Sequence, residues 1–245
     1  MSQPLIVAVS CRKGGVGKTT TAVGIASWFA LRGKKTALIE LDDQANAAFA
    51  LGCDFGTPGA AELLLGRPVE PQQVEEIPNL VVYVGSNELL NAGIAEQDSE
   101  HLRDIAVNLP FDVIVIDCPP RSDHLERMAL VAASVCLIPL IAHPFAVQGA
   151  MRIASIINTR IKNGRPAPTR VALVATRVDP RKRLDKTLFP ELTKLFPQAA
   201  VLQVRTDEQV ALAMAEQRSF VLAFPKARGT QDYESIVKWI LEENA

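Results

Sequence analysis

The first candidate for chemistry is the glycine-rich segment CRKGGVGKTT, residues 11–20. Its end matches the phosphate-loop pattern G-x-x-x-x-G-K-[ST], although Arg12 stands where that pattern begins with glycine. Backbone N–H groups of residues 14–18 can point at phosphate oxygens, with the positive end of a following helix behind them. Lys18 would reach the β- and γ-phosphates, and the Thr19 hydroxyl would take a Mg²⁺ position. The alternative is a glycine-rich turn that carries two unrelated lysines.

A second lysine, Lys13, has no place in that scheme. It lies on the entry side of the loop, too early to fold back easily onto the phosphates of its own nucleotide. A second cation beside a phosphate site suggests charge that is supplied to a transition state, for example across a dimer interface.

Two acidic segments follow predicted strands, IELDDQAN at 39–46 and VIVIDCPP at 113–120. In the second, Asp117 ends a run of β-branched residues, which is the usual place for a carboxylate that holds a Mg²⁺-bound water. Asp42 in the first segment is a candidate for orienting or polarising the attacking water. The alternatives are a surface turn acid for Asp117 and a strand-end cap for Asp42.

Short apolar, β-branched runs alternate with segments of helical periodicity along the whole chain. Strands are expected at Leu5–Ser10, Thr36–Leu41, Leu80–Val84, Val113–Asp117, Val135–Pro139, Arg170–Thr176 and Ala199–Val204. Helices are expected from Thr19 to Gly33 and at Ser99–Asn108, Leu125–Ala133, Phe145–Arg160, Leu184–Phe196, Glu208–Glu216 and Thr230–Glu243. This alternation predicts an α/β fold: a doubly wound, mostly parallel sheet flanked by helices, with ligands at the carboxyl ends of the strands.

At 245 residues the chain is expected to form one domain, residues 1–245, with two small domains as the alternative. No apolar run approaches the roughly 18 residues that span a bilayer, and no signal peptide is expected before the first strand. The four cysteines are widely spaced, which fits buried thiols in a reducing cytosol better than disulfides or an iron–sulfur site.

The net charge of −1 conceals an asymmetry between the two halves of the chain. Residues 1–120 hold 8 Lys+Arg and 15 Asp+Glu, a balance of −7, whereas residues 121–245 hold 18 and 12, a balance of +6. If the fold gathers the basic residues on one face, that face would attract a polyanion without reading its sequence. A solvated surface balanced by nearby carboxylates is the alternative.

KGGVGKTT, LDDQAN and IDCPP, followed by IPLIAHPFAVQG at 138–149, resemble the ParA/MinD family of deviant Walker A ATPases in order and spacing, over essentially the whole chain. The resemblance implies a P-loop NTPase fold, ATP and Mg²⁺ as cofactors, and an ATP-sandwich dimer in which Lys13 crosses to the partner's nucleotide. It also implies that Asp42 serves hydrolysis. The implied ATP-binding residues are Lys13, Gly14, Gly15, Val16, Gly17, Lys18, Thr19 and Thr20, and the implied metal site consists of Thr19, Asp117 through a water and, more weakly, Glu40.

Four positions depart from the family's pattern. Glu40 stands where the family usually has the first Asp of its switch, and Asp43 replaces the switch proline. Arg121 stands where a small residue is common, and His143 where many members carry Glu. These departures leave the predicted ATPase activity intact, and they bear on how the switch behaves and which partner it meets.

The C-terminal segment at 233–245 carries an apolar stripe but ends acidic, so it is expected to pack on the sheet rather than lie on a membrane. The chain most resembles short ParA-type partition ATPases, which lack an N-terminal helix-turn-helix domain. Such proteins bind DNA non-specifically as ATP-bound dimers. The candidate DNA-binding residues, assigned by loose alignment, are Arg181, Lys182, Arg183, Arg205, Arg218 and Arg228.

The resemblance therefore implies a cytoplasmic, nucleoid-associated ATPase whose slow hydrolysis is stimulated by a ParB-like or cargo-adaptor protein. Its cargo would be a plasmid, a chromosome or a protein assembly. The alternatives are a MinD-like positioning ATPase and an ATP-dependent metabolic ligase or metal carrier on the same fold.

Overall fold

The computed structural model describes residues 3–120, 122–142 and 146–242, so the predicted departures at Arg121 and His143 lie outside the described residues. An eight-stranded sheet forms the centre of the fold, in the order β3-β4-β2-β5-β1-β6-β7-β8. All strand pairs are parallel except β3 with β4. The strands are β1 (Leu5–Val9), β2 (Thr36–Glu40), β3 (Gln72–Gln73), β4 (Leu80–Tyr83), β5 (Val113–Asp117), β6 (Val135–Leu140), β7 (Arg170–Val178) and β8 (Ala200–Arg205). The predicted doubly wound, mostly parallel α/β fold is confirmed.

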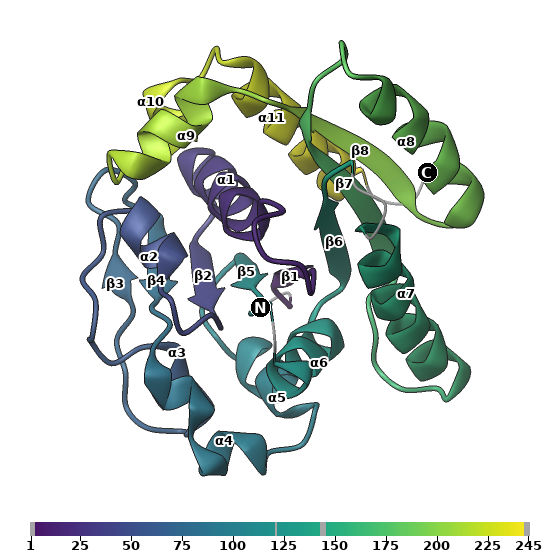
Figure 1. The fold of residues 1–245 in the computed structure, drawn as a ribbon. Coiled ribbons are helices and arrows are strands. Elements are labelled where there is room, and N and C mark those ends of the chain that lie inside the picture. The colour runs from purple at the N-terminus through teal and green to yellow at the C-terminus, as the bar shows by residue number, and fades with distance from the viewer. Residues whose placement is uncertain (1–2, 121, 143–145, 243–245) are drawn as a thin grey trace.

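Helices cover both faces of this sheet (Figure 1). One face packs against α1 (Lys18–Leu31), α2 (Asn46–Ala50), α9 (Glu208–Ala215), α10 (Phe220–Ala223) and α11 (Arg228–Leu241). The other face packs against α3 (Ala60–Leu64), α4 (Ala92–Ala95), α5 (His101–Ala106), α6 (Asp123–Ala132), α7 (Ala146–Lys162) and α8 (Arg183–Leu195). A 3₁₀ turn, η1 (Asn87–Leu90), precedes α4.

Strand β1 shows why two helical layers are needed. Val7 and Val9 point into the core under α1, whereas Ile6 and Ala8 point into the core on the opposite face. Successive side chains of a strand alternate between faces, so a fully apolar strand is stable only when both faces are covered. Because the central strands are parallel, their carboxyl ends and the loops that follow them lie at one rim of the sheet.

Helix α1 lies against the middle of the sheet and is buried from Thr21 to Ala30. Gly24 allows this close packing, because a Cβ there would lie 2.6 Å from the ring of Phe220. Helix α11 packs beside α1 on the same face of the sheet, where it also contacts β8, and it buries Ile236, Val237 and Ile240. Most of the apolar stripe of the C-terminal segment packs in the core, as predicted, but Leu241 at its end is exposed. No helix among the described residues has the length and apolar character to cross a bilayer.

The helices and strands that the sequence predicted are present, with shifts of a few residues at their ends. The prediction omitted the short elements α2, α3, β3, η1, α4 and α10. Two of these, α2 and η1, lie beside the site that the carboxyl ends of the strands form.

Candidate nucleotide-binding site

The glycine-rich segment forms the loop between the end of β1 and the beginning of α1. Gly15 and Gly17 have φ angles of 72° and 88°, which lie in the left-handed region that glycine adopts without strain. Gly17 also caps α1, so the free N–H groups of the first helical turn face the loop. A Cβ added at Gly14 or Gly15 would meet no atom within 4 Å. The loop is an open backbone cradle of the kind that binds phosphate.

A side chain from β7, that of Thr176, supports this loop through hydrogen bonds. The Thr176 hydroxyl lies 2.7 Å from the carbonyl oxygen of Val16 and 3.1 Å from the carbonyl oxygen of Leu140, and it can donate its proton to either. Thr176 is buried, so it fixes the loop against the ends of β6 and β7. Thr176 could not be recognised as a support of the loop from the sequence, because its only signal there is its place at the end of a predicted strand.

Lys18 and Lys13 face different clefts. Lys18 is only 7% exposed, its ammonium donates to the carbonyl oxygen of Lys13 at 3.4 Å, and it lines a cleft of about 500 Å³ together with Thr19. Lys13 is half-buried and lines a neighbouring cleft of about 660 Å³, whose wall includes Leu90 and Pro120. The two clefts share Gly14, Asp42, Gln44 and Pro120. One loop thus presents one lysine inward and the other toward a separate surface.

Asp117 ends β5 and is 1% exposed. Neither of its carboxylate oxygens has a hydrogen-bond partner among the described residues. Burial raises the pKa of Asp117 to about 8, and the Glu40 carboxylate adds to the rise, while the neighbouring Thr19 hydroxyl and Lys18 ammonium lower the pKa. A buried carboxylate without partners is unfavourable, so a cation or a proton at this position would stabilise the site.

These residues fit a Mg²⁺ ion that keeps most of its ligands as water and phosphate oxygens. The described residues contain no group of three or more His, Cys, Asp or Glu side chains placed to hold a metal on their own. Mg²⁺ typically binds through one or two protein groups plus substrate phosphates, and Thr19 with Asp117 supplies such a set.

Glu40, at the end of β2, has its carboxylate bound by backbone amides. Its oxygens accept from Ala47 N at 2.6 Å, Ala48 N at 3.3 Å and Gly85 N at 3.4 Å. Burial raises the pKa of Glu40 to about 7, against these hydrogen bonds, which lower it. Glu40 thus joins the beginning of α2 to the loop after β4. A role for Glu40 in the metal site stays a prediction.

Asp42 lies between the two clefts and is 8% exposed. Its Oδ1 accepts from Gln44 N at 3.2 Å, and burial raises the pKa of the carboxyl. The backbone at Asp42 packs tightly on Gly85, where an added Cβ would lie 2.0 Å from the Asp42 carbonyl oxygen. Both position and burial of Asp42 therefore depend on the loop after β4, which the sequence did not connect to it.

Arg177, one of the basic residues of the second half of the chain, also lies at this site, where the sequence did not predict it. It has a φ of 54°, unusual for a non-glycine residue, at an irregularity of β7 between Ala175 and Val178. Its exposed side chain lines both the Lys18 cleft and an adjoining cleft of about 430 Å³ that contains Asp207. Strained backbone at the rim of a cleft is a frequent property of ligand sites.

The six candidate DNA-binding residues do not form one cluster. Arg181, Lys182 and Arg183 follow β7 and are exposed, but Arg181 is paired with Asp179 at 2.9 Å. Arg205 pairs with Asp232 at 2.7 Å and Arg218 with Glu76 at 2.9 Å. Glu76 lies after β3, at the opposite edge of the sheet from β7 and β8. Arg228 is exposed at the beginning of α11. DNA binding by these residues stays a prediction.

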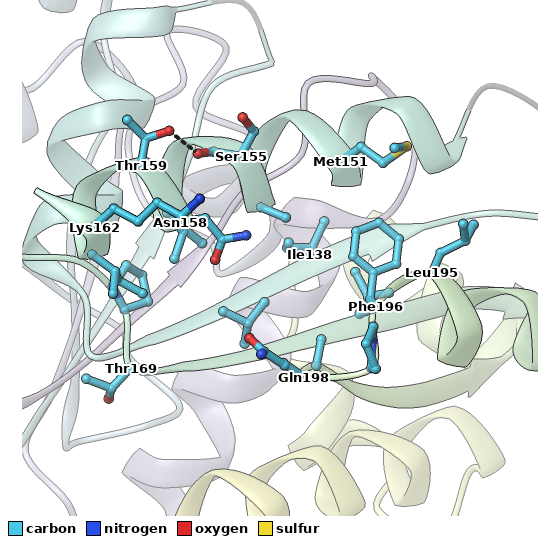
Figure 2. A pocket seen from close by; sticks show the side chains of 18 residues that line it. Ile138, Met151, Ser155, Asn158, Thr159, Lys162, Thr169, Leu195, Phe196 and Gln198 are labelled. Atoms are coloured by element: carbon cyan, nitrogen blue, oxygen red, sulfur yellow. Dashed lines mark hydrogen bonds between the residues drawn. The ribbon is translucent and has the colours of Figure 1, made fainter.

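A groove of about 610 Å³ lies away from the loop, between α7 and the residues that follow α8 (Figure 2). Met151, Asn158 and Lys162 of α7 face Phe196 and Gln198 across it (Figure 2). Its lining includes the first residues of β7, so it opens toward the amino ends of the strands. Ligands of doubly wound folds bind at the carboxyl ends, which favours the clefts beside Lys13 and Lys18 as the functional site.

Comparison with known proteins agrees with this geometry. A family model described as an AAA domain matches residues 5–167. The chain is 30% identical to the chromosome-partitioning ATPase Soj of Treponema pallidum, over 94% of each chain. It is 28% identical to the chromosome partitioning protein ParA of Myxococcus xanthus, over 98% of this chain and 88% of that one.

Among solved structures, the septum site-determining protein MinD of Pyrococcus horikoshii, complexed with Mg-ADP, shares the fold. Its TM-score is 0.78, with 17% identity over 98% of this chain and 96% of that one. At this identity the likeness concerns the fold alone, an eight-stranded sheet with helices on both faces.

Proposed function

This chain belongs to the ParA/MinD family of ATPases, and we propose that it is a nucleotide-dependent switch that partitions or positions a cargo on DNA. The observation that carries the proposal is the pair of lysines on one loop, with Lys18 inside the phosphate cradle and Lys13 in a separate cleft. In this proposal one subunit uses only the first of these cations for its own nucleotide. The second is suited to complete the site of another copy of the chain.

In this proposal the cradle from Gly14 to Thr20 binds the phosphates of ATP through its backbone N–H groups. Lys18, already desolvated, adds a positive charge at the β- and γ-phosphates. Thr19 and Asp117 hold Mg²⁺, the latter through a water, and the ion supplies charge neutralisation on the phosphate oxygens. Arg177 lies beyond the cradle, so the nucleoside would extend along its cleft.

Hydrolysis is assigned to Asp42 and Lys13, which share one cleft. Asp42 orients or polarises the attacking water, and Lys13 of the partner subunit stabilises charge on the phosphates in an ATP-sandwich dimer. Burial raises the pKa of Asp42, and its backbone packs closely on Gly85, so the carboxyl is held in place beside the cleft. Slow turnover that a ParB-like or cargo-adaptor protein stimulates would then set the lifetime of the dimer.

Non-specific binding to the nucleoid is assigned to the ATP-bound dimer, which would place the protein in the cytoplasm on DNA. The basic balance of residues 121–245 and the exposed Lys182, Arg183 and Arg228 support this part of the proposal. Dimerisation would double the number of these exposed basic residues. Their contacts with DNA phosphates would give binding that weakens steeply with salt.

Light scattering after gel filtration tests the dimer. With Mg·ATP, Asp42→Ala is expected to elute as a dimer, and with ADP as a monomer. Lys13→Ala is expected to bind ATP with affinity near that of the wild type but to lose turnover, whereas Lys34→Ala, at an exposed lysine after α1, serves as the matched control. A monomer in both nucleotides, or unchanged turnover in Lys13→Ala, would overturn the sandwich.

Retention on random-sequence DNA tests the non-specific DNA binding that is assigned to the ATP-bound dimer. The Asp42→Ala variant is expected to bind DNA with ATP but not with ADP, and to be released by moderate salt. Binding to anionic vesicles in place of DNA, or DNA retention that ignores nucleotide and salt, would refute this part of the proposal.

A further inference from the structure

Arg12, the residue that replaces the first glycine of the phosphate-loop pattern, is held in an ion-pair network with helix α6. Its Nε donates to Glu126 Oε2 at 2.8 Å, and its NH1 lies 2.5 Å from Asp123 Oδ1. The side chain of Glu126 is 2% exposed and that of Arg12 20% exposed, so the pair is largely out of solvent. A buried charge pair of this kind is far more sensitive to loss of one partner than an exposed one.

The same carboxylate also holds the residue that begins the loop. Ser10 donates from its hydroxyl to Glu126 Oε1 at 2.7 Å. Glu126 thus binds Ser10 with one carboxylate oxygen and Arg12 with the other. Ser10 and Arg12 flank Cys11, and Lys13 follows Arg12 directly. We call Ser10, Arg12, Asp123 and Glu126 the entry clamp.

The entry clamp connects two parts of the nucleotide site. Helix α6 begins at Asp123, directly after the segment that follows Asp117. Pro119, Pro120 and Ser122 of that segment line the same cleft as Lys13. A displacement of the segment after Asp117 would therefore reach α6, and through Glu126 it would reach the backbone that carries Lys13.

We propose that Arg12 is a positioning residue, which acts through Glu126 to hold the backbone of Lys13 in the orientation that faces its own cleft. This inference rests on the proposed function of Lys13. It assigns no contact with nucleotide to Arg12, whose charge is taken up by Glu126 and Asp123. The phosphate cradle from Gly14 onward keeps its separate support from Thr176.

Substitutions at Arg12 should affect the turnover of ATP and the affinity for ATP differently. In Arg12→Gln, the maximal turnover should fall about tenfold or more, because Lys13 is no longer held, while the KM for ATP stays within about threefold of the wild type. Arg12→Lys should give an intermediate turnover, because an ammonium lacks the planar fork that meets two carboxylates. Arg152→Ala is the matched control, since it removes only the exposed contact of Arg152 with Asp123 at 3.2 Å.

Cys11 offers a readout in the protein without nucleotide. Its side chain is buried between the two clamped residues, and the other cysteines, Cys53, Cys118 and Cys136, are also buried. In the clamp variants, alkylation of Cys11 by N-ethylmaleimide, followed by mass spectrometry of peptides, should accelerate about tenfold or more relative to Cys53. In Arg152→Ala the ratio should stay at its wild-type value.

Arg12→Gln leaves Glu126 buried without its cation and can fail to fold. The double variant Arg12→Met/Glu126→Leu avoids this, since an apolar pair of similar volume is often tolerated in place of a buried ion pair. It should fold, expose Cys11 to alkylation and turn over slowly. Wild-type turnover or wild-type protection of Cys11 in the folded double variant would overturn the proposal.

Lys13→Ala, measured in parallel, separates the clamp from the function on which it rests. Lost turnover in Lys13→Ala together with normal turnover in the Arg12 variants overturns the clamp alone. Normal turnover in Lys13→Ala overturns the role of Lys13, and with it the positioning role of Arg12.

Discussion

Replacement of Asp117 by Asn should stabilise the protein in the absence of ligand while removing its response to magnesium. In the fold, both carboxylate oxygens of Asp117 are buried without a hydrogen-bond partner among the described residues. The substitution keeps the shape of the side chain and removes its charge. The opposing effects on stability and on metal binding make this change a sharp test of the site.

The magnitude follows from the pKa of Asp117, which burial raises from 3.8 to about 8. Because the folded pKa is the higher one, the carboxyl favours the folded state only below pH 4, and that contribution is lost between about pH 4 and pH 8. At about 1.4 kcal/mol for each pKa unit, the loss above pH 8 is on the order of 6 kcal/mol. A buried amide that lacks partners costs about 1–3 kcal/mol, so Asp117→Asn should be more stable by about 3 kcal/mol at pH 8.

Urea denaturation followed by circular dichroism at pH 4, 6 and 8 measures this difference. At pH 4, where the carboxyl is protonated in the folded state, the gain should be gone and Asp117→Asn should be less stable than wild type by the cost of its unpartnered amide, about 1–3 kcal/mol. With Mg·ATP at about 100 times its dissociation constant, wild type should gain about 3 kcal/mol and Asp117→Asn much less. Glu96→Gln, at an exposed carboxylate, is the control for a change of net charge.

A variant that is no more stable than wild type at pH 8 would refute the assignment of Asp117 as an uncompensated buried carboxylate. Equal stabilisation of both proteins by Mg·ATP would refute its part in the metal site. The pH dependence distinguishes these outcomes from a general packing effect, which would be the same at every pH.

Three further substitutions test the supports of the site. Thr176→Val leaves the Val16 carbonyl without its donor and should destabilise the fold by about 1–3 kcal/mol and weaken ATP binding, measured by denaturation and calorimetry. Gly85→Ala must displace the backbone of Asp42, only 2.0 Å from the new Cβ, so turnover should fall more than ATP affinity in steady-state kinetics. Gly24→Ala overfills the contact between α1 and α10 and should lower stability by about 1–3 kcal/mol in thermal unfolding, despite the better helix propensity of alanine.

Much of the fold could be predicted from the sequence because it is made of long, regular elements. The apolar runs that became β1, β5 and β6 are buried on both faces, and such runs are typical of parallel strands. The short elements α2 and α4 have five and four residues, too few for a helical period to be visible. They were therefore missed for a physical reason, since helices of this length depend on tertiary contacts.

The candidate site residues also divide into those that local sequence predicts and those whose partners lie far along the chain. The positions of Lys18 and Thr19 at the beginning of α1 and of Asp117 at the end of β5 could be predicted, because they follow from contiguous residues, while their binding of ATP and Mg²⁺ stays a prediction. The pairing of Arg205 and Arg218 with carboxylates could not be predicted, since Asp232 and Glu76 lie 27 and 142 residues from their partners. A charge count of each half of the chain gives no information about such neighbours.

The sequence by itself determined the phosphate loop, its surplus lysine and the acids that end two strands, because each is a local pattern with its own backbone chemistry. Only the tertiary structure decided what holds that loop. Thr176 lies 160 residues from Val16, and Glu126 lies 116 residues from Ser10. The order of the strands brings them together, with β5 and β6 on either side of β1. Long-range contacts of this kind follow from the packing of the sheet, and local sequence patterns do not encode them.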